Sequence, residues 1–212
     1  LRGGLVAFDR DGRTLRGIVA VHEICREAVH TALHGRRVAL VALDPGDEVV
    51  CGWPSFPSYV LGAMKVGATP VCVPLSGDRY NLDALLDAVT PRTKIVYVCN
   101  PNNPTGTMVG RAALDDYFAR VPEHVMTLVD EAYFEYVDDP DYPDGIEEHF
   151  KAGRRVLVLR TFSKIYGLAG LRVGYGIGQN EVVDAIKKVR KAIASGDKAT
   201  AEKSLAKATK KL

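Results

Sequence analysis

The sequence predicts an α/β protein in which a mostly parallel sheet is sandwiched by helices. Between residues 47 and 178, short apolar segments alternate with segments that have the periodicity of helices. Most of the apolar segments are near-continuous runs of Val, Ile, Leu, Tyr and Cys, a pattern typical of strands that are buried on both faces. Strand–helix–strand repetition of this kind builds one parallel sheet through right-handed crossovers.

The predicted elements follow in chain order. Strands are expected at residues 48–51, 69–73, 94–99, 125–130, 156–161 and 172–177. Helices are expected between them, at residues 57–66, 82–89, 110–120 and 146–152. Residues 181–194 and 198–212 are rich in Ala and Lys, which favour helices, and the break at Ser195-Gly196-Asp197 predicts a C-terminal helical hairpin.

We divide the chain into three parts. Residues 1–40 form an unassigned N-terminal segment, with a predicted strand at 5–8 and apolar side chains that recur at helical spacing from Ile18 to Ala32. Residues 41–185 contain the strand–helix repetition and form the predicted ligand-binding domain. Residues 186–212 form a basic helical tail with a net charge of +7, which leaves −5 for the rest of a chain whose total is +2.

Composition excludes several classes of protein. The chain has 212 residues, of which 47% are hydrophobic and 25% charged, the balance of a soluble globular protein. No apolar run approaches the roughly 18–20 residues that a membrane span needs. The four cysteines show no CxxC pairing, so we expect free thiols and a cytoplasmic location, and the five histidines share no metal-ligand spacing. Because the chain begins at Leu1 instead of Met, we expect the first residues of the protein to be missing.

Polar side chains follow three neighbouring strands of the predicted sheet. Asn103 follows the strand at 94–99, Asp130 ends the strand at 125–130 with Tyr133 just beyond it, and Lys164 follows the strand at 156–161. Arg172 comes shortly afterwards. Ligands of an open parallel sheet bind beyond the carboxyl ends of its strands, so these side chains are expected to gather at one edge.

The chemistry of these side chains indicates the kind of ligand that the site binds. A lysine that is desolvated at a strand end has a lowered pKa, which makes its amine available to condense with a carbonyl. A buried acid can pair with a pyridinium nitrogen and keep it protonated. Amide and phenol groups can hydrogen-bond a ring hydroxyl, and hydroxyls with an arginine can bind a phosphate. Together these groups predict a site for pyridoxal phosphate, made by Asn103, Asp130, Tyr133, Thr161, Ser163, Lys164 and Arg172.

Residues 44–185 resemble the large, pyridoxal-phosphate-binding domain of fold-type-I aminotransferases, most closely the histidinol-phosphate aminotransferases. The matching motifs are DPGDEVV at 44–50, NPNNPTG at 100–106, DEAY at 130–133, RTFSK at 160–164 and YGLAGLRVGY at 166–175. The resemblance implies that Lys164 binds the cofactor covalently and that Asp130 binds its pyridine nitrogen. It also implies that Asn103 and Tyr133 hold the ring hydroxyl, that Phe56 stacks on the ring, and that Thr161, Ser163 and Arg172 bind the phosphate.

The implied function is transamination of L-histidinol phosphate with 2-oxoglutarate in histidine biosynthesis, by a homodimer that takes a small-molecule amino donor and a 2-oxo acid. An aromatic aminotransferase, or a threonine-phosphate decarboxylase on the same scaffold, is left open by the motifs. The family pattern extends beyond both ends of this chain and includes an arginine that takes the substrate carboxylate. We therefore expect a truncated enzyme with impaired turnover.

A non-catalytic fragment or fusion is the competing hypothesis. Residues from about 185 onward resemble bacterial small-subunit ribosomal protein number twenty, a helical RNA-binding protein, although a solvated pair of basic helices is the favoured interpretation. Two other features are expected to be structural. Glu131 is predicted to lie on the opposite side from Asp130, and the glycines Gly174, Gly176 and Gly178 predict close backbone packing because no helix-opening nucleotide loop follows a strand there.

Overall fold

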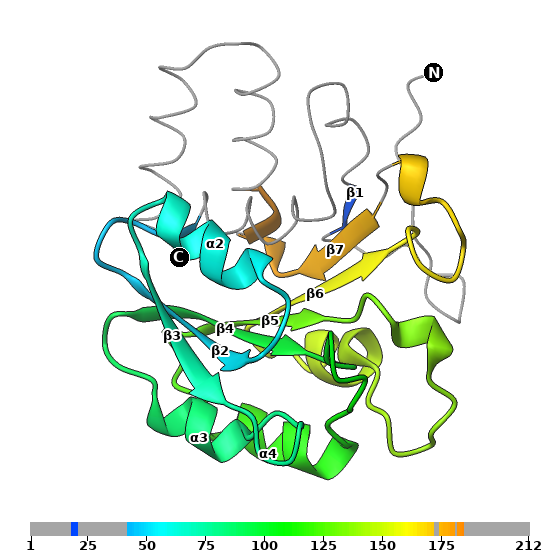
Figure 1. Cartoon of the computed structure of the whole chain (residues 1–212), viewed down its shortest axis with the longest axis horizontal. Helices are drawn as coiled ribbons and strands as arrows, with labels where there is room; N and C mark the ends of the chain where they lie inside the picture. Colours follow the sequence, from blue (N-terminus) through cyan, green and yellow to red (C-terminus); the bar gives the residue numbers. More distant parts are fainter. Residues whose placement is uncertain (1–17, 21–41, 172–173, 181, 185–212) are drawn as a thin grey trace.

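The computed structural model describes residues 18–20, 42–171, 174–180 and 182–184. These residues form a sheet with the strand order β1-β7-β6-β5-β4-β2-β3 (Figure 1). The pairs from β3 through β2, β4 and β5 to β6 are parallel, whereas β7 is antiparallel to both β6 and β1. The strands are β1 Ile18–Ala20, β2 Glu48–Trp53, β3 Thr69–Pro74, β4 Thr93–Cys99, β5 Met126–Asp130, β6 Val156–Thr161 and β7 Gly174–Gly178.

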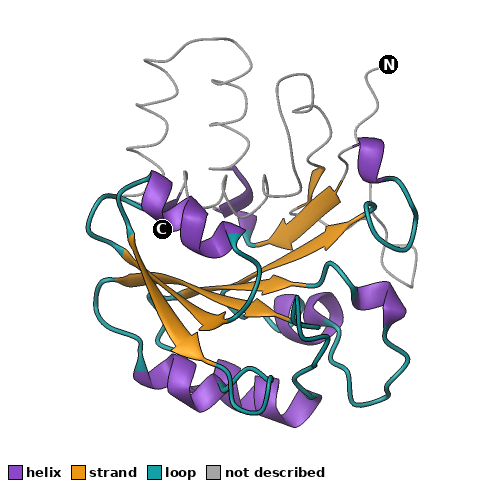
Figure 2. Cartoon of the chain, viewed as in Figure 1, coloured by secondary structure: helices purple, strands orange, loops and turns teal. Residues whose placement is uncertain are grey.

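Helices cover both faces of the sheet, as predicted. Figure 2 shows α2 on one face and α3 and α4 together on the other. The bounds are α2 Ser58–Lys65, α3 Leu82–Asp87 and α4 Arg111–Arg120, with short helical turns η1 Phe134–Tyr136, η2 Gly145–Phe150 and η3 Ala169–Leu171. None of the helices in the described part of the chain is long and apolar enough to cross a membrane.

The central strands are buried because apolar side chains occupy both of their faces. Every residue of β6 is buried, and six of the seven residues of β4 are buried. The edge strand β3 has one buried residue, Val73, which fits its place at the end of the sheet. The mostly parallel α/β fold predicted from these runs is therefore confirmed.

The glycines of β7 permit close packing of backbone against side chain. A Cβ atom on Gly178 would lie 2.9 Å from Leu157 Cδ1 and 3.1 Å from the Val156 carbonyl oxygen. A Cβ atom on Gly176 would lie 3.2 Å from Leu159 Cδ2. The prediction of close packing is confirmed for Gly176 and Gly178.

One prediction was wrong, and one predicted helix differs in its bounds and type. The helical spacing that begins at Ile18 does not produce a helix there, because residues Ile18–Ala20 are extended and pair with β7 as β1. This pairing satisfies backbone groups that would otherwise be exposed along the edge of β7. The helix predicted at 146–152 is present as the shorter π-helix η2, Gly145–Phe150, which begins where the Asp144 carboxylate accepts hydrogen bonds from the Ile146 and Glu147 N–H groups.

Other predictions lie outside the described residues. They include the strand at 5–8, the helical spacing from residue 21 to Ala32, and the helical hairpin at 181–212, apart from residues 182–184. The strand predicted at 172–177 is described only from Gly174 onward, and Arg172 is outside the described part.

Candidate active site

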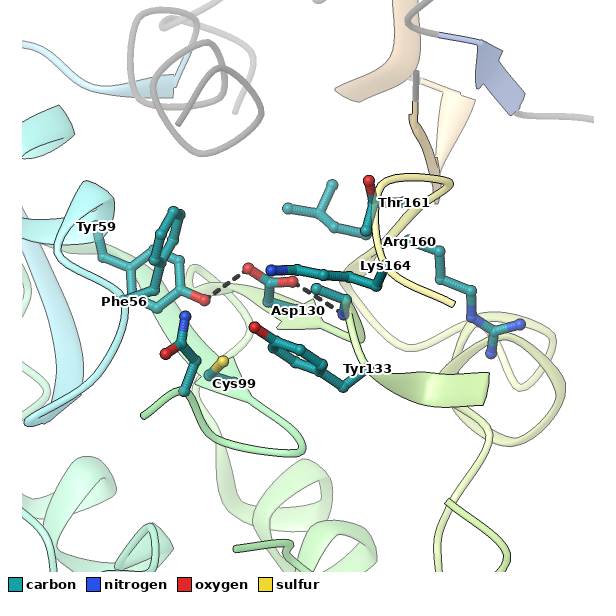
Figure 3. Close-up of a pocket in the computed structure, with 11 residues that line it drawn as sticks. Phe56, Tyr59, Cys99, Asp130, Tyr133, Arg160, Thr161 and Lys164 are labelled. Carbon is teal, nitrogen blue, oxygen red and sulfur yellow. Dashed lines mark hydrogen bonds between the residues drawn. The ribbon is translucent and has the colours of Figure 1, made fainter. Parts of the chain in front are cut away.

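A cavity lies at the carboxyl ends of the central parallel strands (Figure 3). Six of the predicted site residues line it: Phe56, Asn103, Asp130, Tyr133, Thr161 and Lys164. Ser163 is not among the residues that line the cavity, although its backbone N–H donates to Thr161 Oγ1 at 3.1 Å. Arg172 lies outside the described residues. Thus six side chains from four separate segments come together as the sheet topology predicted.

The loop after β4 is shaped by two asparagines other than the predicted one. Asn100 donates through Nδ2 to the Val109 carbonyl and accepts from the Val109 N–H at 2.8 Å, which closes the loop at its base. Asn102 accepts from Ser55 Oγ at 2.8 Å and donates to Thr105 Oγ1 at 2.9 Å. The buried amides of Asn100 and Asn102 therefore stabilise the loop, and Asn103 is the loop asparagine that lines the cavity.

Asp130 ends β5 and its carboxylate is held on both oxygens. Oδ2 accepts a hydrogen bond of 2.6 Å from the Tyr59 hydroxyl, and Oδ1 accepts one of 3.2 Å from the Ala132 N–H. Removal of the carboxyl from water raises the pKa of Asp130, and the Tyr59 hydroxyl, the Ala132 N–H and the Lys164 ammonium oppose that rise. The carboxylate therefore has a fixed orientation toward the cavity.

Lys164 follows β6 in a turn that brings its side chain back over the cavity. Its Nζ lies 4.7 Å from the centre of the Tyr133 ring, and its positive charge acts on Asp130. The turn is held by the Gly167 N–H, which donates to the Lys164 carbonyl at 2.9 Å. Lys164 and Asp130 therefore face one cavity from neighbouring strands, β5 and β6.

Tyr59 lines the same cavity and is a residue that sequence reasoning missed. It is 2% exposed, and its ring stacks on that of Tyr97 with 4.2 Å between centroids. The Phe56 ring meets it edge-on at 5.8 Å. Tyr59 stands in the first turn of α2, which begins after Phe56, and nothing in its sequence position marks the contact with Asp130.

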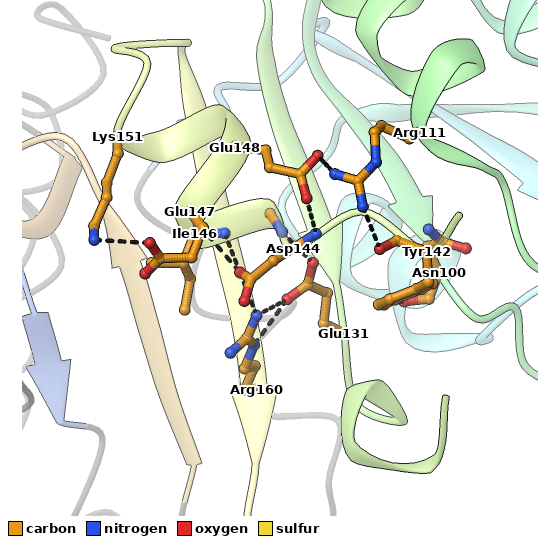
Figure 4. Close-up of polar contacts among 11 residues, drawn as sticks. Asn100, Arg111, Glu131, Tyr142, Asp144, Ile146, Glu147, Glu148, Lys151 and Arg160 are labelled. Carbon is orange, nitrogen blue, oxygen red and sulfur yellow. Dashed lines mark hydrogen bonds and ion pairs between the residues drawn. The ribbon is translucent and has the colours of Figure 1, made fainter. Parts of the chain in front are cut away.

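A second cluster of polar side chains, centred on Arg160, lies beside the site (Figure 4). Arg160 donates to Glu131 Oε2 through Nε at 2.8 Å and to Asp144 Oδ1 through Nη2 at 2.8 Å. The Gly145 N–H donates to Glu131 Oε1 at 2.8 Å. The structural role predicted for Glu131 is confirmed, since its carboxylate joins β5, β6 and η2.

Comparison with known proteins identifies the class. A sequence model of the family described as aminotransferase class I and II matches residues 31–211, so the chain belongs to this family. The matched range includes the segment whose resemblance to a ribosomal protein was noted, and that resemblance gains no support from the comparisons.

Relatives with two different names are similar to this chain. An aromatic amino acid aminotransferase of Thermobifida fusca is 50% identical over 165 residues, which cover 75% of this chain and 46% of that protein. A histidinol-phosphate aminotransferase of Moorella thermoacetica is 47% identical over 156 residues, which cover 73% of this chain and 40% of that protein. This chain thus spans less than half the length of these relatives.

A solved structure agrees with the sequence relatives. The histidinol-phosphate aminotransferase of Sinorhizobium meliloti, solved in complex with pyridoxal-5'-phosphate, superimposes with a TM-score of 0.66 and 29% identity, covering 73% of this chain and 42% of that chain. Pyridoxal phosphate is the cofactor of the family. The residues present fit this group, because a lysine, a carboxylate, a phenol, an amide and an aromatic ring line one cavity.

Proposed function

We propose that this chain binds pyridoxal phosphate and transfers an amino group from a small-molecule donor to a 2-oxo acid. The observation that carries the proposal is the shared cavity in which Lys164, Asp130 and Tyr133 meet at the ends of two adjacent parallel strands. Bound pyridoxal phosphate supplies an aldehyde that condenses with amines and a ring that accepts electrons from the neighbouring carbon.

The side chains of the cavity would hold this group at its distinct chemical features. Lys164 would bind the aldehyde carbon through Nζ and, once displaced by the donor amine, would move the proton of the donor's α-carbon as general base and acid. Asp130 would accept a hydrogen bond from the protonated pyridine nitrogen. Asn103 and Tyr133 would donate to the ring hydroxyl oxygen, and Phe56 would stack on the ring face.

The phosphate would bind next to the turn that follows β6. Thr161 and Ser163 supply hydroxyl donors, and Thr161 lies on the cavity wall. Arg172 supplies a guanidinium whose fork of N–H groups matches two phosphate oxygens. We also propose that the active protein is a homodimer, in keeping with the family.

Two ring-bearing donors are candidates. L-histidinol phosphate, with 2-oxoglutarate as acceptor, is favoured by the motifs and by the name of the Moorella thermoacetica relative. An aromatic amino acid is favoured by the name of the Thermobifida fusca relative, which is 50% identical over the aligned residues. Both donors present a planar ring near an amine.

A single-turnover experiment tests the function and separates the donors. The chain is loaded with pyridoxal phosphate, and histidinol phosphate, phenylalanine or glutamate is added separately while the absorption spectrum of the cofactor is followed. The expected result is conversion to the amine form of the cofactor with one ring-bearing donor and its reversal by 2-oxoglutarate. Absence of cofactor uptake by the wild-type chain, or no spectral change with any of the three donors, would contradict the proposal.

A further inference from the structure

The Tyr59 hydroxyl makes the shortest hydrogen bond to the Asp130 carboxylate. The distance from Tyr59 Oη to Asp130 Oδ2 is 2.6 Å, and the bond joins residues 71 positions apart in the sequence. This distance lies in the range of charge-assisted O–H···O⁻ bonds, which are roughly twice as strong as neutral ones. Figure 3 shows the phenol pointing from α2 across the cavity wall to the carboxylate.

The Tyr59 ring has little freedom to move. It lies nearly parallel to the Tyr97 ring, with an interplanar angle of 13°, and meets the Phe56 ring at 79°. Tyr97 is on β4, the strand next to β5, and is 1% exposed. These ring contacts therefore hold the Tyr59 hydroxyl at a fixed position beside Asp130.

The bond favours the charged form of Asp130. Partial removal from water disfavours the carboxylate, and of the groups that oppose this effect the Tyr59 hydroxyl has the largest influence on the pKa, ahead of the Ala132 N–H and the Lys164 ammonium. A phenol that donates to a carboxylate stabilises it relative to the neutral acid. Because the Tyr59 hydroxyl donates to Oδ2 and the Ala132 N–H donates to Oδ1, the plane of the Asp130 carboxylate is fixed. The remaining lone pairs of its oxygens are then available to a ligand in the cavity.

We infer that Tyr59 is a positioning residue that holds Asp130 ionised and oriented for a protonated ring nitrogen. The inference rests on the proposed function for the identity of the ring, but the Tyr59–Asp130 bond itself belongs to the chain. Tyr59 acts through Asp130 and is not a catalytic residue. Its hydroxyl makes the site selective for a ring that carries a proton at that position.

The first test measures Asp130 in the cofactor-free protein. Tyr59→Phe removes the hydroxyl and keeps the stacked ring, and Tyr117→Phe is the matched control, since Tyr117 is also buried and its hydroxyl lies 3.0 Å from Thr127 Oγ1 outside the cavity. Infrared difference spectra follow the protonated carboxyl band, which Asp130→Asn assigns by deleting it. The pKa of Asp130 is expected to rise by about one unit or more in Tyr59→Phe and to stay unchanged in Tyr117→Phe.

The second test uses two ligands that differ at one ring atom. Pyridoxal phosphate is compared with its carbocyclic analogue, in which a C–H group replaces the ring nitrogen, by titration of the cofactor-free protein. Tyr59→Phe is expected to lose about tenfold in affinity for pyridoxal phosphate, with a change of less than about twofold for the analogue. An equal loss for both ligands would overturn the inference, because it would assign Tyr59 a packing role only.

A further variant guards against poor folding of Tyr59→Phe. A ring-fluorinated tyrosine at position 59 keeps the shape of the side chain and makes the phenol a stronger donor, so the pKa of Asp130 is expected to fall. An unchanged pKa of Asp130 in both variants would overturn the inference. If the wild-type chain binds neither ligand, the proposed function fails, while the infrared measurement still decides whether Tyr59 controls Asp130.

Discussion

The ammonium nitrogen of Lys164 lies 4.7 Å from the centre of the Tyr133 ring, inside the cavity that Asp130 also lines. Lys164 follows β6 and Tyr133 follows β5, and these two strands are parallel neighbours. A cation over an aromatic face is stabilised by about 0.5–1 kcal/mol at a partly exposed site. The contact keeps the ammonium group within the cavity, where its N–H groups stay available to a ligand.

Lys164→Ala is expected to abolish covalent attachment of pyridoxal phosphate. Borohydride reduction of the loaded wild-type chain should fix the cofactor to the peptide that contains Lys164, because reduction converts the lysine–cofactor C=N bond to a stable amine. Mass spectrometry of the digested protein checks this. Lys65→Ala, on the exposed end of α2, is the control and should keep the labelled peptide. A label on another lysine in the wild-type chain would contradict the assignment.

Tyr133→Phe is expected to weaken binding of pyridoxal phosphate by about 2- to 10-fold, the size of one neutral hydrogen bond. Titration of the cofactor-free chain measures the effect. Tyr136→Phe is the control, because its ring lies 6.1 Å from that of Tyr133 but its side chain is 57% exposed. Equal affinities for Tyr133→Phe and the wild-type chain would remove Tyr133 from the proposed ring-hydroxyl contact.

The central sheet could be predicted because each of its strands is a near-continuous apolar run, which is typical of strands buried on both faces. The strand at 156–161 was predicted with the bounds that β6 has, since all six of its residues are buried and apolar runs mark such strands. β1 could not be predicted, because three residues take up the extended form through pairing with β7, whose position depends on the whole sheet. A helix was predicted where η2 lies, but its π form could not be, because Glu131 and Asp144 meet Arg160 only in the folded sheet.

The candidate site was predictable where residue type and strand order suffice. Asp130 ends β5 and Lys164 follows β6, and the parallel order of these two strands brings both residues to one edge. The role of Tyr59 could not be predicted from the sequence, because a tyrosine in an amphipathic helix predicts core packing. Only the fold brings its hydroxyl to Asp130. Ser163 illustrates the reverse case, because its place in the motif does not make it line the cavity.

Glu131→Ala is expected to lower the free energy of unfolding by about 3–5 kcal/mol, because it leaves the guanidinium of Arg160 with Asp144 as its remaining acidic partner among the described ion pairs. Urea unfolding at neutral pH measures the change. The control is Glu147→Ala, which breaks the half-exposed pair with Lys151 and should cost less than about 1 kcal/mol. Similar losses in the two variants would mean that the buried cluster does not stabilise the site.

Glu48→Gln is expected to destabilise the protein by about 1–3 kcal/mol near pH 7, with a difference that shrinks in acid. Hydrogen bonding from the Thr90 hydroxyl, assisted by Arg92, lowers the pKa of the buried Glu48 below its ordinary value of 4.5. A carboxyl with a lowered pKa in the folded state stabilises above its unfolded pKa, and this contribution is lost as pH falls through the folded pKa. Urea unfolding of both proteins across this acidic range checks the sign.

Thr90→Val provides the matched comparison for Glu48→Gln. It keeps the carboxyl and removes the hydroxyl that donates to Glu48 Oε2. We expect a smaller loss of stability and an acid transition that begins at higher pH than in the wild-type chain. A stability difference for Glu48→Gln that stays constant from neutral to acidic pH would show that packing, and not the charge of Glu48, is responsible.

Gly178→Ala is expected to lower the free energy of unfolding by about 1–3 kcal/mol through overpacking. The new methyl group would meet Leu157 Cδ1 at 2.9 Å on the paired strand β6, and the Val156 carbonyl oxygen at 3.1 Å. Gly170→Ala is the control, since nothing lies within 4 Å of its Cβ position. In a Leu157→Val background the clashing Cδ1 atom is gone, so Gly178→Ala should cost less there than in the wild-type chain. Additive losses in this double-mutant cycle would instead trace the cost to the Val156 carbonyl oxygen of β6, because only contacting groups show coupling.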